Sequence, residues 1–189
     1  MERIVIFEKK AMKKLLFLLL IIPPLCFSQI KFKKGVKVLE VTKSPDFKTP
    51  KSILFEFTGD THLIYYYLEL SEKLKKRAKK HDIKVGFNYK LNSKTPLKDD
   101  LETIPKKIES RDNYDSRCHV FYQYVENPKK WIKNGGDPTY RKMTHNMNFR
   151  LFNKNNDEIL FTKFDIHSYF TIVTQSKKTS KKFFKLITE

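Results

Sequence analysis

The sequence predicts an α/β or α+β fold built on a single mixed sheet of about five to six strands, with helices mainly on one face. Two observations carry this prediction. Residues 52–91 have the pattern of a strand, a long amphipathic helix and a second strand, and residues 145–166 have the pattern of a hairpin. A helix between two strands favours a parallel pair, whereas a hairpin adds antiparallel strands. The predicted sheet is therefore mixed.

The strand–helix–strand unit is predicted from two different periodicities. Residues 53–58 form a short apolar run that ends at the turn pair Gly59-Asp60. From Thr61 onward, apolar residues recur at helical spacing, so that they share one face of a helix: Ile64, Tyr67, Leu68, Leu74 and Ala78. Residues 83–91 then alternate strictly between apolar and small or polar side chains, which is typical of a half-buried strand.

The remaining elements follow from shorter patterns. Pro105 limits residues 92–117 to short helical pieces, so this stretch is predicted to be an irregular surface excursion. Residues 118–125 carry apolar side chains on both faces, which indicates a strand in the middle of the sheet. The other predictions are a first strand at 36–41, a loop at 127–140, a hairpin of 145–151 and 159–166 turning at 153–157, and a closing helix at 174–187.

The N-terminal segment has the three parts of a secretory signal peptide. Lys13-Lys14 precede the apolar run 15–22, and small residues favour cleavage after Ser28. A membrane anchor is the alternative, but the run is shorter than the roughly 20 residues that span a bilayer. We therefore predict a signal peptide at 1–28, with 1–11 a misassigned start, and a single domain at 29–189. Lipidation of Cys26 is the minority interpretation, because Pro23-Pro24-Leu25 precede it.

The chain is strongly basic, with a formal net charge of +18, of which +15 remains after residue 28. Such a charge attracts nucleic acid or an anionic membrane surface. The excess is nearly all lysine, however, and it accompanies abundant Asn, Ile and Phe, a bias that an AT-rich genome produces in any protein. Lysine is also a poorer marker of bidentate recognition than arginine. The compositional explanation is favoured over a specific electrostatic function.

Only one cysteine, Cys118, lies outside the predicted signal peptide. A disulfide framework and a cysteine-based metal site are therefore excluded for the mature chain. Because Cys118 opens an apolar run, it is predicted to be a small buried residue.

Three histidines are candidate metal ligands. His119, His145 and His167 lie in or beside predicted strands, and Asp165 is two residues from His167. Neighbouring strands would bring the imidazoles together as a metal site. No local ligand spacing such as H-x-x-x-H supports the site.

The turn between the first two elements of the central unit is a candidate binding site. Asp60, Thr61 and His62 lie where free backbone N–H groups of a helix could hold an anion. Asp60 or Thr61 would equally serve as the helix N-cap, and this structural role is favoured. Trp131, the only tryptophan, is a further binding candidate in the predicted 127–140 loop. No catalytic residue and no cofactor are predicted.

The order of elements resembles small bacterial envelope domains. The strand–helix–strand, hairpin and closing helix are similar to those of the amino-terminal domain of TolB, of relatives of the curli secretion lipoprotein CsgG, and of uncharacterised periplasmic lipoproteins. Pro45-Asp46-Phe47-Lys48 leading into Ser52-Ile53-Leu54-Phe55 is similar to the opening of the lipoprotein group. The signal ending Phe27-Ser28-Gln29 resembles those of flavobacteria. These families supply no catalytic residues to carry over.

The sequence thus favours an exported protein of the periplasm, outer membrane or medium with a non-catalytic binding or assembly role. Its expected partners are an anionic membrane surface or envelope proteins, and its oligomeric state is not predicted. One alternative is a secreted hydrolase that uses the 127–140 loop and the histidines, with a metal-dependent reaction as one form of it. A second alternative is a basic nucleic-acid-binding protein, which requires the signal-peptide prediction to be wrong.

Overall fold

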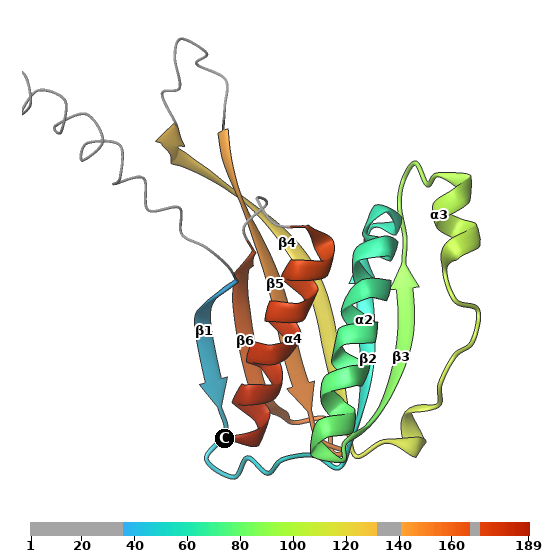
Figure 1. Ribbon diagram of the computed structural model, residues 1–189, viewed down its shortest axis with the longest axis vertical. Coiled ribbons are helices and arrows are strands. Elements are labelled where there is room, and N and C mark those ends of the chain that lie inside the picture. Colours follow the sequence, from blue (N-terminus) through green and yellow to red (C-terminus); the bar gives the residue numbers. More distant parts are fainter. Residues whose placement is uncertain (1–35, 132–140, 167–170) are drawn as a thin grey trace, which may run out of the picture. The chain divides into compact units, whose positions relative to one another are not determined.

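A computed structural model describes residues 36–131, 141–166 and 171–189, without the side chains of 124–131 and 141–144. Its six strands form one mixed sheet, and two long helices lie side by side on one face (Figure 1). The predicted fold class is confirmed. The strands, in spatial order, are β1 (Lys37–Lys43), β6 (Glu158–Ile166), β5 (Arg141–Phe152), β4 (Ser116–Trp131), β2 (Ser52–Gly59) and β3 (Lys84–Leu91).

The central unit folds as its periodicities predict. β2 and β3 pair in parallel, and the helix α2 (Ile64–Ala78) connects them over one face of the sheet. Phe55 and Phe57 of β2 are fully buried beneath the helices. The Phe57 ring lies 4.8 Å from that of Tyr67, and the Phe55 ring lies 5.8 Å from that of Phe183. Removing a buried phenylalanine of this kind costs about 3–5 kcal/mol, so each of these two side chains contributes strongly to the stability of the unit.

The ends of α2 follow from local chemistry. The short 3-10 turn η1 (Thr61–Leu63) precedes it, and the Asp60 carboxylate accepts a hydrogen bond from the His62 N–H at 3.0 Å. At its other end, the turn η2 (Lys79–His81) leads to Asp82, whose φ of 53° is left-handed. The Ile83 N–H then donates to the Ala78 carbonyl at 3.1 Å, which closes the helix in the usual left-handed capping manner.

The strand β4 is central, as predicted, between β2 and β5. It is longer than predicted, because it continues to Trp131 through residues that were expected to begin a loop. The reason is an irregularity: pairing with β5 shifts between Glu126 and Trp131. Pro128 lies in this irregular segment, which is where a strand tolerates a proline that cannot donate to the ladder. Residues 132–140 of the predicted loop lie outside the described residues.

The predicted hairpin and closing helix are present. β5 and β6 pair antiparallel, and the turn holds Asn156 at a φ of 72°. The helix α4 (Ile172–Thr188) begins where the Thr171 hydroxyl accepts a hydrogen bond from the Thr174 N–H. Its far end is tied to the chain before β2, because the Thr49 hydroxyl donates to the Ile187 carbonyl at 2.7 Å.

The excursion between β3 and β4 covers more of the sheet than its polar sequence suggests. It contains the short helix α3 (Lys98–Thr103) and the 3-10 turn η3 (Arg111–Asn113), both beyond β3 (Figure 1). Tyr114 packs against Gly86, and Asn88 bonds to the excursion's backbone. Gly86 and Asn88 are consequently buried, whereas the alternation had predicted a half-buried strand with an exposed second face.

The two long helices run in the same direction. β2, β4 and β6 are mutually parallel, because two antiparallel steps separate β4 from β6. α2 and α4 each return along the sheet from one of these strands, so their N-terminal ends lie at the same end of the sheet (Figure 1). Among the helices of the described ranges, none is both long and apolar enough to span a membrane.

Candidate functional site

The turn after β2 forms a cap rather than an open anion cradle. Gly59 has a φ of 135°, and Asp60 uses its carboxylate to cap η1, which is the favoured structural role. Thr61 is buried, and its hydroxyl has no hydrogen-bond partner within the described part of the chain. The predicted trio is thus adjacent in space, with Thr61 directed inward and Asp60 and His62 at the surface.

His62 joins this turn to α3 through a residue that sequence reasoning did not single out. Its Nδ1 lies 2.9 Å from the Oδ2 of Asp100, whose side chain is almost fully buried. This hydrogen bond, aided by Asp60, raises the pKa of His62 above its ordinary value. Asp100 is 38 residues away in sequence, and no local pattern connects it to His62. The contact fixes α3 beside the end of β2.

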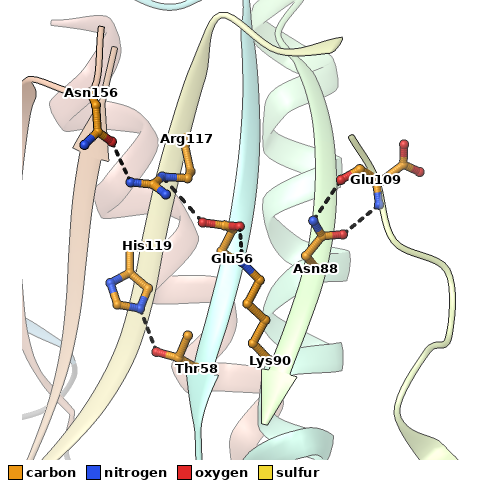
Figure 2. A network of polar contacts seen from close by, with 8 residues as sticks. All are labelled: Glu56, Thr58, Asn88, Lys90, Glu109, Arg117, His119 and Asn156. Atoms are coloured by element: carbon orange, nitrogen blue, oxygen red, sulfur yellow. Dashed lines mark hydrogen bonds and ion pairs between the residues drawn. The ribbon is translucent and has the colours of Figure 1, made fainter. Parts of the chain in front are cut away.

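The face of the sheet opposite α2 and α4 carries a network of polar side chains centred on Glu56 (Figure 2). Its carboxylate lies 2.8 Å from the Lys90 Nζ and 3.5 Å from the Arg117 Nε. Arg117 also donates to the Asn156 side-chain oxygen at 2.8 Å. These contacts connect β2 with both of its neighbours and with the β5–β6 turn. The mostly buried carboxylate is matched by two cations, as a charge in that position requires.

His119 lies on the same face and shares a hydrogen bond of 2.7 Å with the Thr58 hydroxyl (Figure 2). Burial lowers the pKa of His119 below its ordinary value, and the Glu56 carboxylate opposes this effect only in part. The neutral imidazole is therefore favoured. A hydroxyl beside a neutral imidazole resembles a nucleophile–base pair, but a catalytic pair also needs a third group to orient the base. Within the described residues, no hydrogen bond to the other nitrogen of His119 completes such a set.

The predicted histidine ligands are not brought together. His145 occupies the opposite face of the sheet from His119, because its partner in β6 is the buried core residue Ile166. Its ring packs 5.6 Å from that of Tyr122, and burial lowers its pKa. His167 and the side chain of Trp131 lie outside the described residues. In the part of the chain that the structure describes, no three His, Cys, Asp or Glu side chains gather as a metal site would require.

The outer surface of the two long helices is the most highly charged part of the described chain. We define the basic helical layer as the lysines and arginine of α2, η2 and α4. These elements carry eleven basic residues against two glutamates, a net of +9, which is half the charge of the whole chain. The layer consists of Lys73, Lys75, Lys76, Arg77, Lys79, Lys80, Lys177, Lys178, Lys181, Lys182 and Lys185.

Most of these charges have no acidic partner within the described ranges. Lys73 pairs with Glu69 at 2.5 Å, and Lys185 lies 3.5 Å from Glu189. Six exposed lysines have no acidic partner among the described residues: Lys75, Lys76, Lys79, Lys80, Lys177 and Lys181. Sequence reasoning noted the lysines at the end of α2 but treated them as an ordinary solvated helix end. It did not foresee that α4 places a second lysine row beside them.

Comparisons with known proteins give no family for this chain. No family model matches it, and no curated protein sequence matches it. Among solved structures, the fold is similar to that of a point variant of PelC from Paraburkholderia phytofirmans, described as a dodecamer. The TM-score is 0.41 at 13% sequence identity, and the alignment covers 77% of this chain and 94% of that one.

Proposed function

We propose that this protein is a non-catalytic component of the cell envelope that binds anionic membrane surfaces through its basic helical layer. The observation that carries the proposal is the concentration of half the net charge on one helical surface, with six exposed lysines left without acidic partners among the described residues. The signal-peptide pattern of residues 12–28 supports the same compartment.

The electrostatics of this layer suit an extended anionic surface. A lysine near an anionic membrane contributes about 1 kcal/mol, and the attraction decays over a Debye length of about 8 Å at physiological salt. Only charges that lie together on one surface can act within that distance at the same time. Lys177, Lys181 and Lys185 follow one another at i, i+4 spacing along α4. Like charges at this spacing weaken an isolated helix by about 0.2–0.5 kcal/mol per pair. The stability of α4 therefore does not account for this row of lysines.

Apolar side chains are also exposed on these two helices, at the ends where each helix begins. Tyr65 near the start of α2, and Ile172 and Val173 at the start of α4, are each 43–52% exposed. The two helix starts lie at the same end of the sheet (Figure 1). Exposed aromatic and aliphatic groups on helices that also carry lysines are typical of surfaces that sit at a membrane interface, so a membrane fits this surface better than nucleic acid does. Tyr66 and Tyr67, which could have stacked on bases, are buried in the core.

Vesicle flotation tests the proposal. We expect the protein to float with vesicles containing phosphatidylglycerol, to stay behind with pure phosphatidylcholine, and to lose binding as salt rises. A labelled DNA duplex added at equal phosphate concentration distinguishes the alternative. If DNA displaces the protein from the vesicles with a steep salt dependence, the layer is a nucleic-acid surface and the membrane proposal is wrong.

The compartment needs its own measurement. Fractionation of native cells, followed by mass spectrometry of the N-terminal residue, should find a chain beginning at Gln29 outside the cytoplasm. A lipidated Cys26 in the membrane fraction would keep the envelope role and add an anchor. An intact Met1 or Met12 in the cytoplasm would contradict export and with it the proposed role.

A further inference from the structure

Among the described residues, one edge of the sheet is covered by the excursion and the other edge has no further strand. Beyond β3, the excursion lies along the sheet, because the Asn88 amide bonds to the Glu109 backbone in both directions (Figure 2). β1 is the strand at the opposite edge, and it pairs only with β6 among the described strands. Within the described part of the chain, its outer row of backbone N–H and C=O groups is thus left for a further strand.

A groove of about 240 Å³ lies between the helix side of β1 and the end of α4. Val38 and Val41 of β1 and Leu186 of α4 give it an apolar lining. Lys43, Lys182 and Lys185 stand around it, against the single carboxylate of Glu189. An edge strand beside a helix-bounded apolar groove is the arrangement that captures extended peptides by strand addition. The surplus of lysine selects for acidic peptides.

A second copy of this chain is a poor occupant of the edge. In an antiparallel pairing of β1 with itself centred on Glu40, Glu40 would face Glu40, and Lys37 would face Lys43. Like charges directly opposite one another destabilise a strand pair. The irregularity between Val38 and Glu40 further discourages a flat, symmetric pairing. The edge therefore favours a different chain, whose carboxylates face these lysines.

We infer that β1 and α4 form a strand-addition site for an extended acidic segment of another protein. The segment's backbone continues the sheet at β1. Its groove-facing side chains, at alternate positions, are apolar over Val38 and Val41 and acidic where they reach Lys43 and Lys182. Lys182 and Lys185 belong both to this site and to the basic helical layer, but strand addition at β1 is a separate activity from membrane binding and would give the protein an assembly function as well.

A capped seven-residue peptide whose alternate, groove-facing positions are valine, valine, glutamate and glutamate, with threonine between them, is the direct probe. Added to isotope-labelled protein, it should shift the backbone amide signals of residues 38–43 and 182–189. Two control peptides separate the contributions of charge and of backbone hydrogen bonds. One has lysine in place of glutamate, and the other is N-methylated at alternate positions so that it cannot form the hydrogen bonds of a strand pair. Both should bind at least about tenfold more weakly.

Two double variants of the protein test the role of the groove lysines, and both change the net charge by the same amount. K43E with K182E should weaken binding of the acidic peptide by at least about tenfold, whereas K48E with K51E, which alters exposed lysines that do not line the groove, should not. The inference is overturned if the acidic peptide shifts none of these amides, or if the N-methylated or lysine peptide binds equally well. It is also overturned if dihexanoyl phosphatidylglycerol shifts the groove amides and the peptide does not. None of these results depends on vesicle flotation.

Discussion

The side-chain amide of Asn88 forms two hydrogen bonds with the backbone of Glu109, donating to its carbonyl at 2.9 Å and accepting from its N–H at 2.8 Å. A single side chain thereby does what a neighbouring strand would do, and it fastens the excursion beside β3. Asn88 is itself 5% exposed, so both of its polar atoms depend on this contact.

Removing the Asn88 amide should therefore loosen the excursion. We expect Asn88→Ala to lower the free energy of unfolding by about 1–3 kcal/mol and to speed proteolysis between Ile104 and Tyr114. Urea unfolding and limited trypsin digestion measure the two effects. Asn92→Ala is the matched control, because that side chain is exposed and should change neither. Unchanged digestion of the Asn88 variant would show that the excursion is held by other contacts.

Gly86 is needed because Tyr114 lies against it. A Cβ at this position would stand 2.1 Å from the Tyr114 hydroxyl oxygen and 2.5 Å from its Cζ. Although alanine normally suits a strand better than glycine, Gly86→Ala should destabilise the protein by about 1–3 kcal/mol through overpacking. In a Tyr114→Ala background the same change should cost far less, and a double-mutant cycle of unfolding free energies measures the difference. Additive costs would mean that Tyr114 is not the obstacle.

The pKa values of His62 and His119 should be shifted in opposite directions from the ordinary histidine value of 6.5. The bond to Asp100 raises the pKa of His62, so its stabilising contribution is complete below pH 6.5 and is lost as the pH rises through the raised pKa. Burial lowers the pKa of His119, so its contribution is complete above pH 6.5 and is lost as the pH falls through the lowered pKa. An NMR titration, assigned with His62→Gln and His119→Gln, should show His62 above and His119 below 6.5. The reverse order would contradict both contacts.

Cys118 should be unreactive in the folded protein. The thiol is fully buried, and burial raises its pKa well above the ordinary value. Because the thiolate is the reactive species, we expect Ellman's reagent to label the native protein about a hundredfold more slowly than the urea-unfolded protein. Rapid labelling under native conditions would place Cys118 in a part of the sheet that opens readily.

The sequence predicts those elements of the fold whose apolar residues recur with a short, regular spacing. The helical spacing up to Ala78, the alternation of 83–91 and the two-faced apolar character of 118–125 correspond to α2, β3 and a central β4. What it could not supply are contacts between distant residues that follow no local pattern. Asp100 reaches His62, Tyr114 covers Gly86, and the lysine row of α4 lies beside that of α2 only because β6 returns parallel to β2.

The extension of β4 to Trp131 shows a second limit of sequence reasoning. Asn127-Pro128 is a sound turn signal, but the pairing irregularity accommodates it inside a strand. The candidate metal site shows that strand assignments alone do not tell which side chains meet. His119 pairs with Arg150 of β5, which is an odd number of residues from His145. Because side chains alternate along a strand, His119 and His145 point to opposite faces of the sheet.

The most direct test of the proposed membrane role compares two fourfold charge reversals of equal size. One variant carries Lys76→Glu, Lys79→Glu, Lys177→Glu and Lys181→Glu in the basic helical layer. The other carries Lys48→Glu, Lys51→Glu, Lys94→Glu and Lys106→Glu, all exposed and outside it. Both lower the net charge equally, and circular dichroism checks that both fold. In vesicle flotation with phosphatidylglycerol, the layer variant should lose binding while the control keeps most of it. Equal loss by the two variants would show that overall charge, and not the helical layer, governs binding.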